Sequence, residues 1–318
     1  MDVLSNPEIG VLEEVERRWE ELNEDCLVIV FERVGLESLI FDVPLVCKLW
    51  YKATLNPHCW TNLDFSTSFL MSAMLRFSQP MDVNNFSSIL SDVLINFLKI
   101  AVKRSCGSAT KLALPACCTP GALQYVSEEF PSLRVLDMGT ELWDYGNWGD
   151  KTINCSDLNL LHHKCIELLT HHLRKFVSKW EDLEHLSLLL IPKDSFKDIL
   201  TQISLSCKNF VGLSTTGSVY TEEAIAIATA LPKIRYLRLS RSTLPKNSLK
   251  IILDGCEDLV LLDARNCIHF EEDDKEILEI ASHIKTFMFE GSTSFCFDPF
   301  KSYYTNYLFH QAITNTNN

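Results

Sequence analysis

The densest group of potential metal ligands and nucleophiles lies in one short stretch of this 318-residue sequence. The group consists of Cys155, His162, His163, Cys165, His171 and His172. Thiols and imidazoles both bind zinc, but the spacing matches neither a paired Cys-x-x-Cys nor a His-x3-His pattern. In a helix only some of these side chains would share a side. We therefore expect no metal site.

Motifs for catalysis are equally sparse. We find no phosphate-binding Gly-x4-Gly-Lys, no Gly-x-Ser-x-Gly and no His-Glu-x-x-His, and eleven glycines are few for an active site built from loops. Twelve cysteines leave a Cys/His nucleophile pair open, which keeps a cysteine-dependent hydrolase among the alternatives. The main expectation is a protein without catalytic residues and without a cofactor.

The composition predicts a folded chain with an acidic surface. Hydrophobic residues make up 47% of it, and 42 carboxylates outnumber 29 basic residues to give a formal net charge of −13. This charge disfavours binding to nucleic acid and to anionic membranes, because both depend on Lys and Arg. The sequence shows no signal peptide and no apolar run long enough to span a bilayer, so the cysteines fit reduced thiols. We expect a soluble protein of the cytoplasm or nucleus.

A six-residue pattern, apolar-x-x-apolar-x-apolar, recurs along the chain. Its copies start at Trp60, Ala109, Leu133, Leu183, Phe210, Ile234, Leu259 and Ile284. The later copies follow each other every 24 to 27 residues, and amphipathic segments of helical period lie between them. A short strand plus a helix at this period predicts an α/β fold of the leucine-rich-repeat type, a horseshoe arc of about seven to eight repeats.

The period fails twice, between Trp60 and Ala109 and between Leu133 and Leu183. Each gap holds either one degenerate repeat or a long insertion, and we place insertions near 66–105 and 139–157. Helical periodicity predicts one helix over 86–105 and another over about 158–177.

Several cysteines keep a fixed phase within the repeat. Cys106, Cys207 and Cys256 each stand three residues before the first position of the pattern, and Cys117 and Cys267 stand eight after it. This recurrence predicts buried structural thiols between adjacent coils. It resembles the cysteine-containing class of leucine-rich repeats, to which F-box proteins commonly belong.

The segment before the repeats resembles an F-box. Its first helix would begin at Leu22–Leu27 and continue to Val30 and Phe31, and Val46–Trp50 reads Val-Cys-Lys-x-Trp as the family does, with Trp60 closing the segment. Asn23 stands where the family has proline, and Asn can cap a helix start. The resemblance is strongest to plant proteins that combine an F-box with leucine-rich repeats.

The resemblance implies four segments. They are an N-terminal extension over 1–15, a three-helix F-box over 16–60, leucine-rich repeats over 61–291, and a C-terminal cap with a tail over 292–318. It also implies that the F-box docks on a Skp-type adaptor, and through it on a cullin. The contacts would be Leu22, Leu27, Val30, Phe31, Val46 and Trp50. The alternative for Val46 and Trp50 is that they belong to the chain's own core.

A target would bind on the concave face of the arc, where alternate strand residues point. One column there is predicted to hold Asp137, Ser187, Ser214, Arg238, Asp263 and Met288. Flanking columns would hold His185, Tyr236, Leu261 and Thr286 on one side, and Leu189, Thr216, Ser240, Arg265 and Glu290 on the other. We expect Tyr236, Arg238, Asp263 and Arg265 to bind the target, since Tyr and Arg are frequent interface anchors. Trp143 and Trp148, in a polar loop, form a competing site, and a concave face without any partner is the alternative.

Together these expectations describe a non-catalytic subunit of a Skp-cullin-F-box ubiquitin ligase that binds an unidentified protein. The alternative is a leucine-rich-repeat scaffold without a ligase, in which the F-box-like segment only caps the first repeat.

Overall fold

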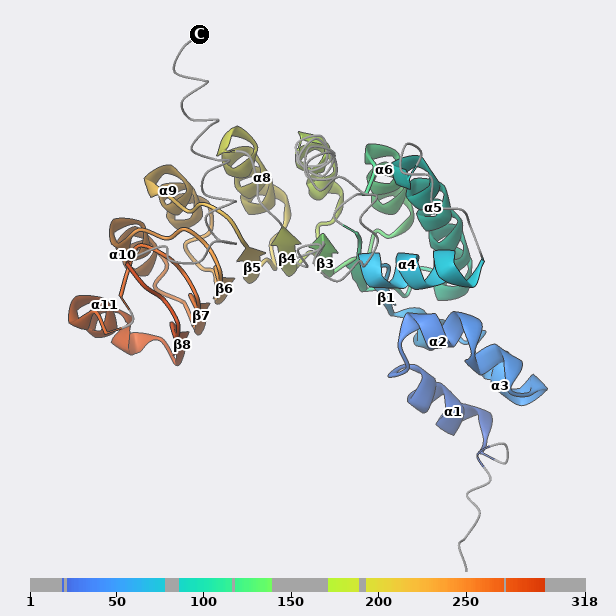
Figure 1. The fold of residues 1–318 in the computed structure, drawn as a ribbon. Coiled ribbons are helices and arrows are strands. Elements are labelled where there is room, and N and C mark those ends of the chain that lie inside the picture. The colour runs from blue at the N-terminus through green and yellow to red at the C-terminus, as the bar shows by residue number, and fades with distance from the viewer. Residues whose placement is uncertain are drawn as a thin grey trace, which may run out of the picture.

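The computed structural model describes residue 19 and residues 22–77, 86–115, 118–138, 171–188, 193–271 and 273–294. Within them the chain is a mixed α/β structure built around one parallel sheet of eight strands. Figure 1 shows an arc with the strands along its inner side and helices along its outer side. This architecture is consistent with the leucine-rich-repeat solenoid that the sequence pattern predicts.

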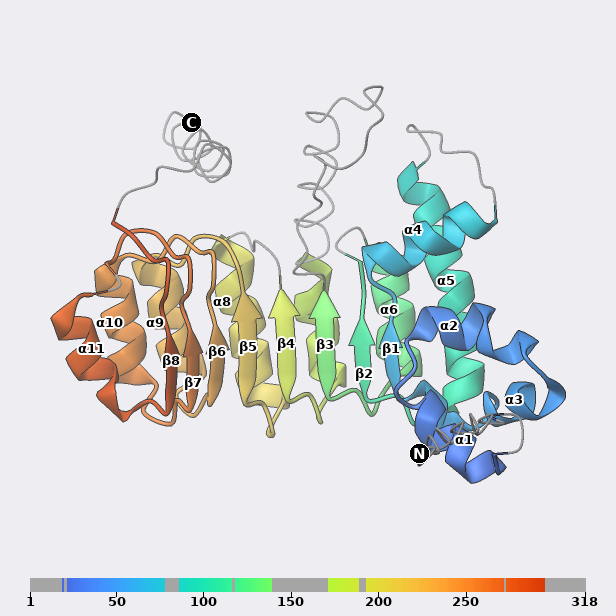
Figure 2. The same cartoon turned by 60° about the horizontal axis from the view of Figure 1, so that its bottom comes forward.

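Each copy of the six-residue pattern contributes one strand, so the strand positions predicted from the sequence are confirmed. The strands are β1 (Asn62–Asp64), β2 (Lys111–Ala113), β3 (Val135–Met138), β4 (His185–Leu188), β5 (Gly212–Thr215), β6 (Tyr236–Arg238), β7 (Leu261–Asp263) and β8 (Thr286–Met288). They lie side by side in sequence order, and every neighbouring pair is parallel (Figure 2). The second residue of β1 to β7 is a leucine that points inward and is buried. These stacked leucines form the spine of the core.

Helices cover the outer side of the sheet. They are α5 (Phe86–Ser105), α6 (Pro120–Glu129), η5 (Val177–Lys179), α8 (Lys193–Ser206), α9 (Thr221–Ala230), α10 (Lys246–Gly255), α11 (Lys275–Ile280) and η6 (Ala281–His283), while α4 (Thr67–Arg76) follows β1 and contacts α5. The bounds of α5 confirm the helix predicted over 86–105. None of the described helices combines the length and the apolar character needed to cross a membrane. Their apolar sides face the leucine spine instead.

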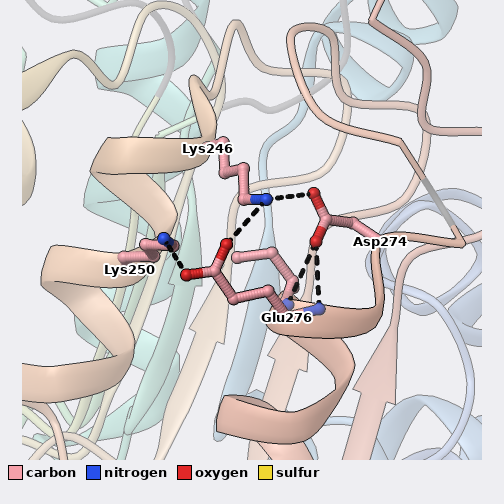
Figure 3. Close-up of polar contacts among 5 residues, drawn as sticks. Lys246, Lys250, Asp274 and Glu276 are labelled. Carbon is pink, nitrogen blue, oxygen red and sulfur yellow. Dashed lines mark hydrogen bonds and ion pairs between the residues drawn. The ribbon is translucent and has the colours of Figure 1, made fainter.

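Helices α10 and α11 are joined by a cluster of ion pairs (Figure 3). The Lys246 Nζ of α10 lies 2.6 Å from Asp274 Oδ2 and 2.9 Å from Glu276 Oε2, and Lys250 also pairs with Glu276. Asp274 is the N-cap of α11, where its Oδ1 accepts hydrogen bonds from the backbone N–H of Glu276 and Ile277. The hydrogen bond from Lys246, together with these backbone bonds, holds the pKa of Asp274 below its usual value. One carboxylate thus caps a helix and ties it to its neighbour.

The strands that flank each long gap in the period pair directly with each other. β1 pairs directly with β2, with Leu63 opposite Leu112, and β3 pairs directly with β4, with Leu136 opposite Leu186. The first gap contains α4 and α5, while residues 139–170 of the second lie outside the described part. Neither gap places a repeat between the strands that flank it.

The N-terminal module consists of short helices. They are α1 (Glu24–Phe31), α2 (Leu36–Phe41), η2 (Val43–Leu45), α3 (Lys48–Ala53) and η3 (Pro57–Trp60). Asn23 is the N-cap of α1, and its side-chain oxygen accepts a hydrogen bond of 3.1 Å from the backbone N–H of Cys26. Such a cap stabilises a helix by about 1 kcal/mol, so α1 has a capped start at Asn23.

The N-terminal module is fixed to the arc. Only Thr61 lies between η3 and β1. Phe41 of α2 packs against three phenylalanines of the first helical insertion: Phe69, Phe77 and Phe97. Arg76 of α4 lies 5.1 Å from the centre of the Phe41 ring and forms ion pairs with Glu37 and Asp42. Aromatic packing and ion pairs therefore hold the two parts in one orientation.

The repeated cysteines are buried, with one exception. Cys207, Cys256 and Cys267 are buried, and each thiol donates a hydrogen bond to a backbone carbonyl of the preceding coil. The prediction is wrong for Cys106, which is exposed. There the chain leaves α5 through two residues with positive φ, Cys106 at 47° and Gly107 at 82°, so it turns differently from the ends of the later helices. Cys117 lies outside the described residues.

Candidate protein-interaction surfaces

Large apolar side chains are exposed on the N-terminal module. We call them the exposed apolar set: Ile29, Val30, Leu45, Val46 and Tyr51. They come from α1, η2, α3 and the residue after η2, and α3 contacts both α1 and η2. Leu45 is 82% exposed and Val46 is 56% exposed. Solvated apolar groups at this density are typical of a surface that a partner covers.

The six predicted adaptor contacts divide into three pairs by burial. Val30 and Val46 are exposed, and Leu22 and Trp50 are partly buried against the core. Leu27 and Phe31 are 1% and 2% exposed, and the Phe31 ring meets the Trp50 ring edge-on at 5.3 Å. The structure therefore places Leu27 and Phe31 inside the module. The contact of all six with a partner stays a prediction.

Sequence reasoning left out three members of the exposed apolar set, Ile29, Leu45 and Tyr51. Val28 and Ile29 widen the apolar stripe of α1, and the structure buries the first and exposes the second. Leu45 follows Pro44 at the end of a 3-10 turn, where the side chain faces solvent. Uninterrupted apolar runs were the available signal, but they do not show which side faces inward.

The concave face has the predicted columns. Strand register aligns Asp137, Ser187, Ser214, Arg238, Asp263 and Met288. It likewise aligns His185, Gly212, Tyr236, Leu261 and Thr286 in the neighbouring column. In the third predicted column, Leu189 lies outside the described residues. The two aligned columns, which run across β3 to β8, define the concave face below.

Two aromatic rings meet across a glycine on this face. His185 of β4 and Tyr236 of β6 lie on strands separated by β5, yet their ring centres are 5.6 Å apart. The intervening residue is Gly212, where an added Cβ would lie 1.9 Å from the His185 Nδ1. Arg235 lies 5.8 Å from the centre of the Tyr236 ring. We call His185, Gly212 and Tyr236 the aromatic platform.

The surroundings of the His185 ring favour its neutral form. Burial lowers the pKa of the imidazole, and the positive charges of Arg238 and Lys111 lower it further, against the opposing charge of Glu184. The platform therefore offers a polar aromatic surface rather than a cation.

The two arginines of the predicted target site differ in their partners. The Arg265 side chain donates hydrogen bonds from Nε and Nη2 to the two carboxylate oxygens of Asp263, at 2.9 and 2.8 Å. The backbone N–H of Arg265 donates a third hydrogen bond to Asp263 Oδ1. Asp263 is 3% exposed; burial alone would raise its pKa, but Arg265 and Arg238 hold that pKa below its usual value. The side chain of Arg238 is exposed and forms no hydrogen bond or ion pair with any described residue, although its charge acts on Asp263. Arg238 is thus open to a ligand, whereas Asp263 and Arg265 satisfy each other.

The competing sites fall outside what the structure describes. Trp143 and Trp148 lie in residues 139–170, as does most of the helix expected over 158–177. Of the cysteine and histidine group, only His171 and His172 are described, and their rings lie 5.5 Å apart.

Known proteins match the chain over most of its length. No protein-family model matches it. An F-box/LRR-repeat protein of Arabidopsis thaliana is 27% identical over 288 residues, which cover 86% of this chain and 84% of the relative. The F-box proteins FBW2 and SKIP19 of the same plant are 25% and 24% identical, over 81% and 79% of this chain and 71% and 70% of their own lengths. These relatives, together with the strand-and-helix arc, support the assignment of this chain to the F-box/leucine-rich-repeat proteins.

Proposed function

We propose that this protein is the substrate-recognition subunit of a Skp-cullin-F-box ubiquitin ligase. In this proposal residues 22–60 are a three-helix F-box that docks on a Skp-type adaptor, and the eight strands are the repeats of an arc that holds the target. Relatives named as F-box/LRR-repeat and F-box proteins support a role of this kind at the level of the family. The observation that carries the proposal is the exposed apolar set on the N-terminal module.

Contact of the exposed apolar set with water is unfavourable in free energy unless a partner covers these side chains. Apolar surface removed from water contributes roughly 25 cal/mol per Å², so covering several such side chains stabilises a complex by several kcal/mol before the costs of association.

The buried residues of the N-terminal module hold the exposed apolar set in place. The Phe31 and Trp50 rings pack α1 against α3 and so fix the spacing of Val30 on one helix and Val46 beside the other. A module this small has little core of its own, which makes its fixed junction with the arc part of its stability. We therefore assign direct adaptor contact to the exposed apolar set, with Leu22 and Trp50 at its margin.

The proposed subunit performs no chemistry itself. Its contribution is to hold a target beside the catalytic part of the ligase, which raises the effective concentration of the reacting groups. Such a role needs two surfaces in a fixed relation and no activated nucleophile. This is the role for which the arc, the module and their rigid junction are suited.

The test is binding of a Skp-type adaptor from Arabidopsis, co-expressed with the chain. We expect the intact protein to co-purify with the adaptor and the double variant Leu45→Asp, Val46→Asp to lose at least about 30-fold in affinity by calorimetry. Leu205→Asp is the matched control, because Leu205 is 71% exposed on α8, away from the module. Both variants should keep the melting temperature of the intact chain, since the replaced side chains are solvated. No binding by intact protein would favour the scaffold alternative.

A further inference from the structure

Arg238 on the concave face is an exposed cation on a protein of net charge −13. Arg238 on β6 and Lys111 on β2 are exposed, and neither forms an ion pair with a described residue. Both lie close enough to His185 for their charges to act on it. An unpaired cationic spot inside an acidic protein attracts an anionic ligand selectively, because the surrounding carboxylates repel anions elsewhere.

The nearest carboxylate does not neutralise Arg238. Asp263 stands beside Arg238 in the strand register, but both of its oxygens are held by Arg265 and its side chain is buried. On the other side of Arg238, the register places Ser214 and then Ser187. These small side chains leave the guanidinium accessible from β4 and β5. Arg238 is therefore presented with its donors unused.

The aromatic platform lies in the column next to Arg238. Tyr236 and Arg238 are two residues apart on one strand, so their side chains leave the sheet on the same side, roughly 6.7 Å apart. An extended peptide has the same spacing between alternate side chains. A peptide can thus place one side chain on Tyr236 and the next but one on Arg238 without bending.

We infer that the concave face binds an extended peptide segment of the target, with an aromatic or aliphatic side chain on the aromatic platform and an Asp or Glu carboxylate, two residues away, on Arg238. The inference rests on the proposed function, for which it names the class of target. A carboxylate fits a single guanidinium through two parallel hydrogen bonds. A phosphate dianion would instead need several cations.

The test uses the full chain, with and without a Skp-type adaptor, and a phage-displayed library of random short peptides. We expect enriched sequences to carry an aromatic or large aliphatic residue two positions from Asp or Glu. A synthetic fluorescent copy should lose about 10- to 100-fold in affinity for Arg238→Glu, and part of that for Arg238→Lys, which keeps the charge but not the paired donors. Lys233→Glu, with the same change of charge in the exposed turn before β6, is the matched control.

A change of specificity is the sharpest readout. Selection on Arg238→Glu should enrich Lys or Arg at the position where the intact chain selects Asp or Glu. The inference is overturned if no peptide is enriched, if enriched peptides bind Arg238→Glu as well as the intact chain, or if phosphoserine in place of the acidic residue binds more tightly. Adaptor binding is measured on the same samples. Absence of peptide binding with adaptor binding retained contradicts this inference alone, whereas absence of adaptor binding contradicts the proposed function.

Discussion

The ring of His185 occupies the space in which any other residue at Gly212 would carry its side chain. A Cβ built at Gly212 lies 1.9 Å from His185 Nδ1 and 2.5 Å from Cε1. This absence of a side chain lets the imidazole cross one strand and reach Tyr236 on the next. The glycine is needed here for close approach rather than for an unusual backbone angle.

Replacing Gly212 by alanine should therefore expel the His185 ring. We expect Gly212→Ala to lower the free energy of unfolding by about 1–2 kcal/mol, since overpacking of a half-buried ring is costly. In the double variant His185→Ala, Gly212→Ala the clash is absent, so the two effects should not add. Urea unfolding of the four proteins measures this coupling. Equal stability of Gly212→Ala and the intact chain would contradict the packing described.

Truncating Phe31 should affect the fold before it affects binding. Its ring is almost fully buried against Trp50, so Phe31→Ala should lower the free energy of unfolding by about 3–5 kcal/mol. Any loss of adaptor binding would then follow from unfolding of α1 and α3. Hydrogen exchange of the module compared between Phe31→Ala and Val30→Ala distinguishes the roles, because Val30→Ala removes an exposed side chain and should leave exchange unchanged.

The cap of α11 should give the last repeat a pH-dependent stability. Asp274→Ala removes the N-cap and the ion pair with Lys246, and we expect a loss of about 1 kcal/mol at neutral pH. The folded state lowers the pKa of Asp274, so its contribution is present above the unfolded value near 4 and is lost as the pH falls through the folded value. Urea unfolding at several pH values should show the difference between intact chain and variant shrink in acid.

Asp273 provides the control for this measurement. It is the exposed neighbour of Asp274 and makes no side-chain hydrogen bond with any described residue. Asp273→Ala should change stability by less than about 0.5 kcal/mol at every pH. A difference that stays constant into acid for Asp274→Ala would show that the carboxylate charge is not what stabilises α11.

The buried thiols should be inert in the native protein. Burial raises the pKa of Cys256 to about 12, and burial together with the charge of Glu181 raises that of Cys207 to about 11. Because only the thiolate reacts, iodoacetamide near pH 8 should label the exposed Cys26 and Cys106 first, and Cys207 and Cys256 only after denaturation. Mass spectrometry of the labelled peptides gives the order. Rapid native labelling of a thiol at low pH would revive the cysteine-hydrolase alternative.

The sequence predicts the sheet well because each strand is defined by local pattern. Leu186 and Leu213 recur in the same phase of the repeat, and parallel stacking requires nothing more than that repetition. Cys106 shares the phase of Cys207 but not its burial, since a positive φ at the end of α5 redirects it. Backbone handedness of this kind leaves no clear signature in a single sequence.

The candidate surfaces were predicted less completely, because they depend on contacts between distant residues. Apolar character alone does not separate Phe31, which meets Trp50 inside the module, from Val30, which faces solvent. The pattern placed Arg238 and Asp263 in one column. It does not show that Arg265 forms hydrogen bonds to Asp263 and so leaves Arg238 open, because this depends on side-chain geometry.

The single residue between η3 and β1 also limits how far the two ends of the molecule can turn relative to each other. Thr61 is the whole connection, and the Phe41 ring packs against Phe69 and Phe97 of the first insertion. The orientation of the N-terminal module is therefore tied to that of the strands. A partner bound to the N-terminal module therefore fixes the position and orientation of a ligand bound along the strands.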